Sequence, residues 1–186
     1  MAVVVPQLRS QWESDWKLDE VAAIGSLPLK QDSTTIRLGE LYRQWWNAIQ
    51  ADLPSGDERR WLEQIQLDYA ELLWRIDEQV LAKEVLDSWK PSTNTTRWRR
   101  QMARILSHLN HPSSATAAEE IWRDLLTQFP AGSRDWFEAK YYLLQAMVSR
   151  DPSQAKLVFQ QLRQLYPDFP APWAAVLAQL ADDNRW

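Results

Sequence analysis

The chain has 186 residues, of which 45% are hydrophobic and 25% charged, and its formal net charge is −4. This length and composition suffice for the core of one domain or of an array of comparable size. The absence of cysteine excludes disulfides, a thiol nucleophile and cysteine-ligated zinc. The acidic balance disfavours nucleic acid as a partner, because phosphate binding relies on clustered Lys and Arg.

The first 54 residues are predicted to carry two helices. Apolar residues at four-residue intervals predict a helix near residues 7–23, and a broad apolar face predicts a second near 35–52. The short apolar run before Pro6 has neither the positive charge of a signal peptide nor the length of a membrane span. We therefore expect a cytoplasmic chain without a membrane segment. Residues 1–54 form either an N-terminal helical cap or a divergent first repeat.

Seven further helices are expected after residue 54. Ser55, followed three residues later by Glu58, has the pattern of a capping box and begins the first of them. Prolines separate several of the later helices, since proline ends a helix and also suits its first position. The few glycines and the scarcity of β-branched runs disfavour sheets, so an all-α chain of about nine helices is predicted. The expected ranges are 56–76, 79–89, 96–109, 114–129, 134–149, 152–165 and 170–182.

Tryptophans recur through this second part at nearly equal intervals. The separations between Trp61, Trp98, Trp136 and Trp173 are 37, 38 and 37 residues. The segment from Ala118 to Pro130 also matches the segment from Ala155 to Pro167 at an offset of 37 residues. In both, a small residue, an aromatic four later and a leucine three after that lie on one helical face. A fixed period of this size predicts a stack of similar helix pairs.

At these positions the chain resembles the tetratricopeptide repeat family. The resemblance implies a right-handed α–α superhelix, or solenoid, of antiparallel helix pairs over residues 55–186. It departs from the family in its longer period, against about 34 residues, and in lacking Leu-Gly after each tryptophan. The half-a-tetratricopeptide repeats of RNA-processing factors share the emphasis on tryptophan and proline. The matching residues are the four tryptophans, then Ala82, Ala118 and Ala155, then Leu86, Trp122 and Phe159, and finally Pro130 and Pro167.

The resemblance further implies a non-catalytic scaffold that binds a protein or peptide through a concave surface lined by the first helix of each pair. An acidic partner would suit the arginines on that surface, and no cofactor is expected. The alternative is an RNA-associated helical-repeat protein. The sequence indicates neither the partner nor the oligomeric state, nor whether the chain is a segment of a larger repeat protein. Carried over to this sequence, the family's groove positions include Arg59, Gln66, Tyr69, Arg99, Ala103, Arg134, Phe137 and Tyr141.

Few other residues suggest chemistry. Arg97, Arg100 and Arg104 share one helical face, which either pairs with acidic residues of a neighbouring helix or binds an anionic partner. His108 and His111 lie three residues apart at a helix end, where packing is favoured over a shared metal because no third ligand is near. No catalytic motif is present, so the chain is not expected to be an enzyme.

Overall fold

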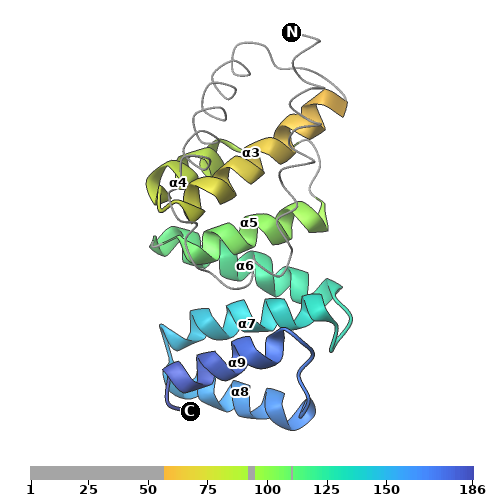
Figure 1. The fold of residues 1–186 in the computed structure, drawn as a ribbon, viewed down its shortest axis with the longest axis vertical. Helices are drawn as coiled ribbons and strands as arrows, with labels where there is room; N and C mark the ends of the chain where they lie inside the picture. Colours follow the sequence, from red (N-terminus) through yellow and green to blue (C-terminus); the bar gives the residue numbers. More distant parts are fainter. Residues whose placement is uncertain (1–56, 92–94, 110) are drawn as a thin grey trace.

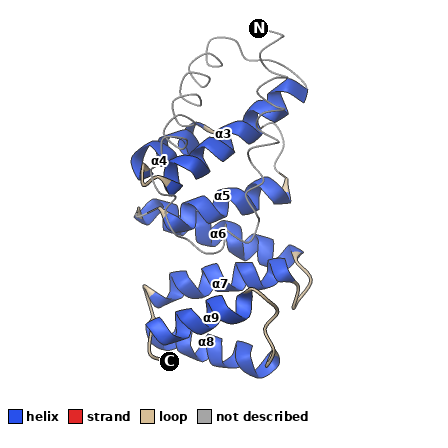
Figure 2. Ribbon diagram, in the orientation of Figure 1, coloured by secondary structure: helices blue, strands red, loops and turns tan. Residues whose placement is uncertain are grey.

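The computed structural model describes residues 57–91, 95–109 and 111–186, and these ranges contain seven helices and no strand. Figures 1 and 2 show the helices and the loops between them. The predicted all-α class is therefore confirmed for this part of the chain. The helices predicted near 7–23 and 35–52, and with them the predicted cap of residues 1–54, lie outside the described residues. The helices are α3 (Asp57–Arg75), α4 (Gln79–Ser88), α5 (Thr96–His108), α6 (Pro112–Gln128), α7 (Arg134–Val148), α8 (Pro152–Leu165) and α9 (Trp173–Asp183).

The helices pack in pairs along the long axis of the molecule (Figure 1). Helix α3 packs against α4, α5 against α6, and α7 against α8. The first members of the pairs also contact one another, because α5 packs against both α3 and α7, and α7 packs against α9. Segments almost forty residues apart in sequence therefore lie side by side, as the spacing of the tryptophans predicts.

Two of the first helices begin in the same way. Thr95 is the N-cap of α5, and its side chain accepts a hydrogen bond from the backbone N–H of Trp98. Ser133 is the N-cap of α7, and its side chain accepts from the backbone N–H of Trp136. Such caps satisfy an N–H group that has no partner within the helix. Each tryptophan is thus the third residue of its helix, and the cap fixes where it enters the core.

The second helices α6 and α8 also match in burial and in their ends. The backbone N–H of Phe129 donates to the carbonyl of Leu125 at the end of α6, and that of Tyr166 donates to Leu162 at the end of α8. The same offset of 37 residues relates the buried positions of the two helices. The buried pairs are Ala118 and Ala155, Trp122 and Phe159, and Leu125 and Leu162.

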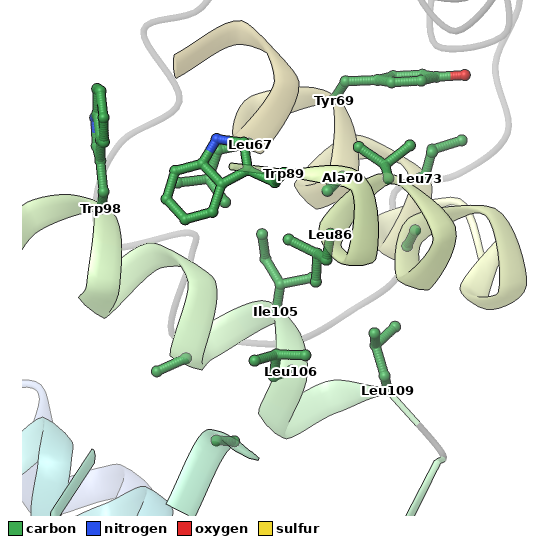
Figure 3. Close-up of a cluster of buried hydrophobic side chains, with 14 of the residues drawn as sticks. Leu67, Tyr69, Ala70, Leu73, Leu86, Trp89, Trp98, Ile105, Leu106 and Leu109 are labelled. Carbon is green, nitrogen blue, oxygen red and sulfur yellow. The ribbon is translucent and has the colours of Figure 1, made fainter. Parts of the chain in front are cut away.

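The buried apolar side chains form two clusters that meet at α7. The first lies mainly among α3, α4, α5 and α6; Figure 3 shows part of it, with Trp89 and Trp98 in edge contact at 5.8 Å between ring centroids. The second lies among α7, α8 and α9. Helix α7 contributes Tyr142 to the first cluster and Phe137 to the second, so it links the two.

The periodic tryptophans have unequal exposure. Trp98 and Trp173 are buried, as expected from the large apolar area of an indole. Trp136 is half-buried at the edge of the second cluster, where its ring contacts Tyr166. The side chain of Trp61 lies outside the described part of the structure. Of the three periodic tryptophans whose side chains are described, Trp136 therefore retains a partly accessible ring.

Candidate functional site

Four of the eight predicted groove residues are buried within the chain. Tyr69, Ala103 and Phe137 belong to the two apolar clusters. Gln66 is also buried, and its amide is satisfied by donating to the backbone carbonyl of Val85 on α4. The first helices pack against their own partners and against one another, and this packing occupies positions that the family pattern assigns to a groove. These four side chains therefore face the interior, and contact with a partner stays a prediction for them.

The remaining four all have accessible surface, and three of them lie outside the arginine-rich segment of α5. Arg59 is exposed on α3 and pairs with Glu63 one turn further along, at 3.0 Å. Arg134 is exposed in the first turn of α7. Tyr141 is half-buried, with its ring centroid 5.9 Å from that of Trp173 on α9. These side chains come from α3 and α7 and could contact a partner without rearrangement of the core.

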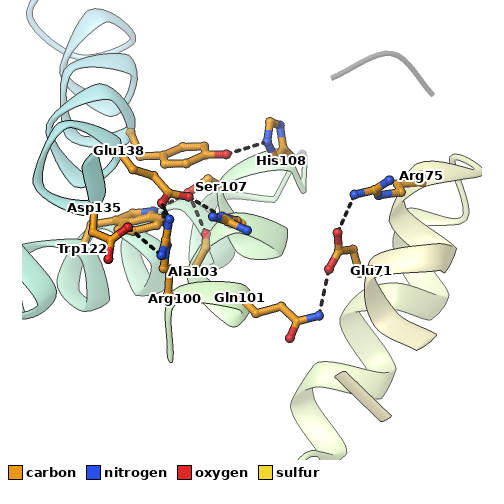
Figure 4. Close-up of polar contacts among 12 residues, drawn as sticks. Glu71, Arg75, Arg100, Gln101, Ala103, Ser107, His108, Trp122, Asp135 and Glu138 are labelled. Carbon is orange, nitrogen blue, oxygen red and sulfur yellow. Dashed lines mark hydrogen bonds and ion pairs between the residues drawn. The ribbon is translucent and has the colours of Figure 1, made fainter. Parts of the chain in front are cut away.

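The fourth residue, Arg99, belongs to an arginine-rich segment of α5 that is paired within the chain. Arg99 forms an ion pair with Asp124 on α6. Arg100 and Arg104 both bind the carboxylate of Glu138 on α7, whose side chain is only 1% exposed (Figure 4). For Arg100 and Arg104 the structure thus matches the interpretation in which this helical face neutralises acidic residues of a neighbouring helix, since a buried carboxylate requires such partners, whereas Arg97 is exposed.

A second polar layer lies between α3 and α5. The amide of Gln101 donates to Asp68 at 2.7 Å and to Glu71 at 2.8 Å, and the amide of Gln64 donates to Asp68 at 2.7 Å. Burial raises the pKa of Asp68 to about 6, even though the hydrogen bonds from Gln101 and Gln64 lower it. The indole N–H of Trp98 donates to Gln64. The periodic tryptophan therefore also orients this polar layer.

The two histidines have separate structural roles. The ring of His108 stacks on Trp74, with centroids 4.3 Å apart, and its Nε2 lies 3.2 Å from the hydroxyl of Tyr142. Burial, with a smaller contribution from nearby positive charge, lowers the pKa of His108 to about 4. His111 is the N-cap of α6 and accepts from the backbone N–H of Ser113. Among the described residues, no group of three or more His, Cys, Asp or Glu side chains could hold a metal ion.

A small cavity lies among α6, α7 and α8, and its volume is about 120 Å³. The groove positions of the family pattern do not include its polar residues. A sequence signal exists for one pair, because Glu119 and Arg123 are four residues apart on one helix. The contribution of Arg150, which follows α7, could not be read from spacing. The cavity is lined by Glu119, Arg123, Lys140, Leu143, Leu144, Met147 and Val158.

Comparisons of the chain with family models, curated proteins and solved structures find no match. None of the helices within the described ranges is both long and apolar enough to cross a membrane.

Proposed function

We propose that the described helices belong to a tetratricopeptide-like α–α superhelix, a right-handed solenoid of antiparallel pairs over residues 55–186. The contacts among α3, α5, α7 and α9 support this arrangement, since in a solenoid each unit packs only on its neighbours. The equivalent caps of α5 and α7 and the matched burial in α6 and α8 support it further.

The function that this architecture supports best is a non-catalytic scaffold for a protein or peptide partner. The observation that carries the proposal is the repetition itself: the apolar positions buried in α6 are buried again in α8, 37 residues later. Similar units stacked in a row produce an extended surface, which suits a macromolecular partner better than a small substrate. The surface proposed for binding is the concave one, lined by the first helix of each pair.

Three of the predicted groove residues have the most freedom to contact a partner. They are Arg134 and Tyr141 on α7 and Arg59 on α3. Arginine would orient an acidic partner, and the half-buried tyrosine would supply apolar contact area. The alternative of an RNA partner has less support, because Arg99, Arg100 and Arg104 already neutralise carboxylates of this chain.

The test is affinity capture with the wild-type chain and with an Arg59→Glu/Arg134→Glu variant. Captured proteins are identified and the interaction is repeated with purified components. Loss of the interaction in the variant, at unchanged thermal stability, supports the proposed surface. Lys156→Glu/Arg163→Glu is the matched control, since both residues are exposed on α8 and the change in charge is the same.

A salt titration with labelled single-stranded RNA separates the two functions. Binding dominated by phosphate contacts weakens steeply as salt increases. Tight, salt-sensitive RNA binding without any reproducible protein partner would contradict the scaffold proposal.

A further inference from the structure

The cavity among α6, α7 and α8 combines an apolar lining with positive charge at its rim. Leu144 on α7 is buried, and Leu143 and Met147 on α7 and Val158 on α8 are half-buried, so four apolar side chains face a space of about 120 Å³. An apolar cavity of roughly 150 Å³ is large enough to hold a benzene molecule. The space here therefore suits one bulky aliphatic side chain and little more.

The charges at the rim are unbalanced. One oxygen of the buried carboxylate of Glu119 binds both Arg123, at 2.5 Å, and Arg150, at 2.6 Å. The side chains of these arginines are 65% and 58% exposed, so part of each guanidinium faces solvent. Lys140 lies 5.0 Å above the ring of Trp136 and forms no ion pair with any described residue. Two of these three cations thus share one carboxylate, and Lys140 has no carboxylate partner among the described residues.

Lys140 is held close to the apolar lining. It is half-buried, and this burial lowers its pKa from the ordinary value. A partly desolvated ammonium gains more from a carboxylate partner than a fully hydrated one, because the attraction is less screened. The rim therefore favours an anionic group placed beside the apolar one.

We propose that this cavity binds a peptide segment in which a bulky aliphatic residue stands next to acidic residues. The aliphatic side chain enters between α7 and α8, and the acidic neighbours pair with Lys140, Arg123 and Arg150. A peptide is the occupant that fits, because pockets for drug-sized ligands are several times larger, about 300–1,000 Å³, and because the rim charges lie outside the apolar space, where only neighbouring residues of a longer chain reach them. The inference rests on the proposed scaffold function and adds to its concave surface a second site, which includes the second helices α6 and α8.

Two kinds of variant test the two halves of the proposal. Val158→Phe fills the apolar space. Arg123→Gln/Lys140→Gln removes two rim charges and leaves Arg150 to pair with Glu119. Lys156→Gln/Arg163→Gln is the control, since it removes two positive charges from exposed positions on α8 outside the cavity lining. Circular dichroism and thermal unfolding establish that each variant is folded; if Val158→Phe does not fold, Met147→Phe replaces it.

The probe is a displayed library of random peptides selected on the wild-type chain, followed by fluorescence anisotropy with the enriched peptides. We expect enrichment of sequences that place Leu, Ile or Met beside Asp or Glu. We expect their affinity to fall at least tenfold with Val158→Phe and at least fivefold with Arg123→Gln/Lys140→Gln. The control variant should stay within twofold of wild type.

Several results would overturn the proposal. Enriched peptides that bind Val158→Phe as tightly as wild type would place the binding surface elsewhere and leave the scaffold function standing. Enriched peptides without acidic residues would remove the role of the rim charges. Hexanoate that competes at the concentration of the best peptides would make the cavity a site for small carboxylic acids. A library that yields no binder above background would contradict both the cavity proposal and the peptide-binding function.

Discussion

Arg104 on α5 donates through its guanidinium Nε to the buried carboxylate of Glu138 on α7. Helix α7 supplies side chains to both apolar clusters, so this ion pair lies at the interface that links them. A buried charge without a partner is far more costly than the same charge in water. The register of α5 against α7 is therefore coupled to this one carboxylate.

Replacing Glu138 by alanine should destabilise the fold by about 3–5 kcal/mol, because Arg100 and Arg104 lose their shared buried partner. Urea unfolding followed by circular dichroism measures the loss. Asp135→Ala is the control: its carboxylate also pairs with Arg100, at 2.7 Å, but its side chain is 42% exposed. We expect the control to cost about 1 kcal/mol or less. Equal losses in the two variants would mean that burial of Glu138 does not determine its contribution.

The pKa values of Asp68 and His108 should act on stability in opposite directions. The folded chain keeps His108 neutral down to about pH 4, whereas the unfolded chain protonates it near its ordinary pKa of 6.5. Stability from His108 therefore falls as pH decreases from 6.5 to 4. Asp68 has a folded pKa of about 6 against an ordinary 3.8, so its contribution is greatest at low pH and is lost as pH rises from 3.8 to 6. Between pH 4 and 6 the two slopes nearly cancel.

Single substitutions should reveal each slope. With Asp68→Asn, the free energy of unfolding should rise between pH 4 and 6 relative to wild type, because only the titration of His108 still contributes over this interval. With His108→Gln it should fall over the same interval. Each change should reach about 2–3 kcal/mol, at about 1.4 kcal/mol per pKa unit. Chemical unfolding at several pH values provides the measurement. Parallel pH profiles for all three chains would show that these groups do not titrate as inferred.

Gly132, between α6 and α7, should tolerate no side chain. Its φ is +80°, a left-handed conformation, and a Cβ there would lie 3.0 Å from Cε1 of Tyr166. Gly132→Ala should therefore destabilise by about 1–3 kcal/mol. Asp77 has a φ of +66°, so Asp77→Gly should be neutral or stabilise by up to about 1 kcal/mol. Thermal unfolding compares the two, and a harmless Gly132→Ala would show that the loop can rearrange.

The sequence predicts the helices of the described residues well because their signals are local. Thr95 and Ser133 cap helices where the spacing of the tryptophans places a helix start, and the apolar stripe of Ala118 and Trp122 is buried as its periodicity indicates. The candidate site is harder to predict, because exposure depends on packing between helices. Ala103 occupies a family groove position, yet it is buried.

The ion pairs likewise fall into two kinds, those that spacing along one helix predicts and those that depend on how the helices pack. Glu119 and Arg123 are four residues apart on α6 and could be paired from sequence alone. The contact of Arg150 with Glu119 spans 31 residues and depends on how the end of α7 returns to α6. Spacing along one helix gives no signal for such a contact, so the cavity beside it becomes visible only in three dimensions.

Loss of one core aromatic should weaken the neighbouring cluster as well as its own. Trp122 stacks on Tyr142 of α7, with ring centroids 4.8 Å apart, and its indole N–H donates to Ser107 at 3.0 Å. Trp122→Ala should cost about 3–5 kcal/mol. Because Tyr142 belongs to the helix that also supplies Phe137 to the second cluster, faster hydrogen exchange should spread from α6 into α7 and α8.

Leu165→Ala, at a position that is 75% exposed, should change stability by less than about 0.5 kcal/mol and leave exchange unaltered. Faster exchange confined to α6 would show that the two clusters unfold independently and that α7 does not couple them.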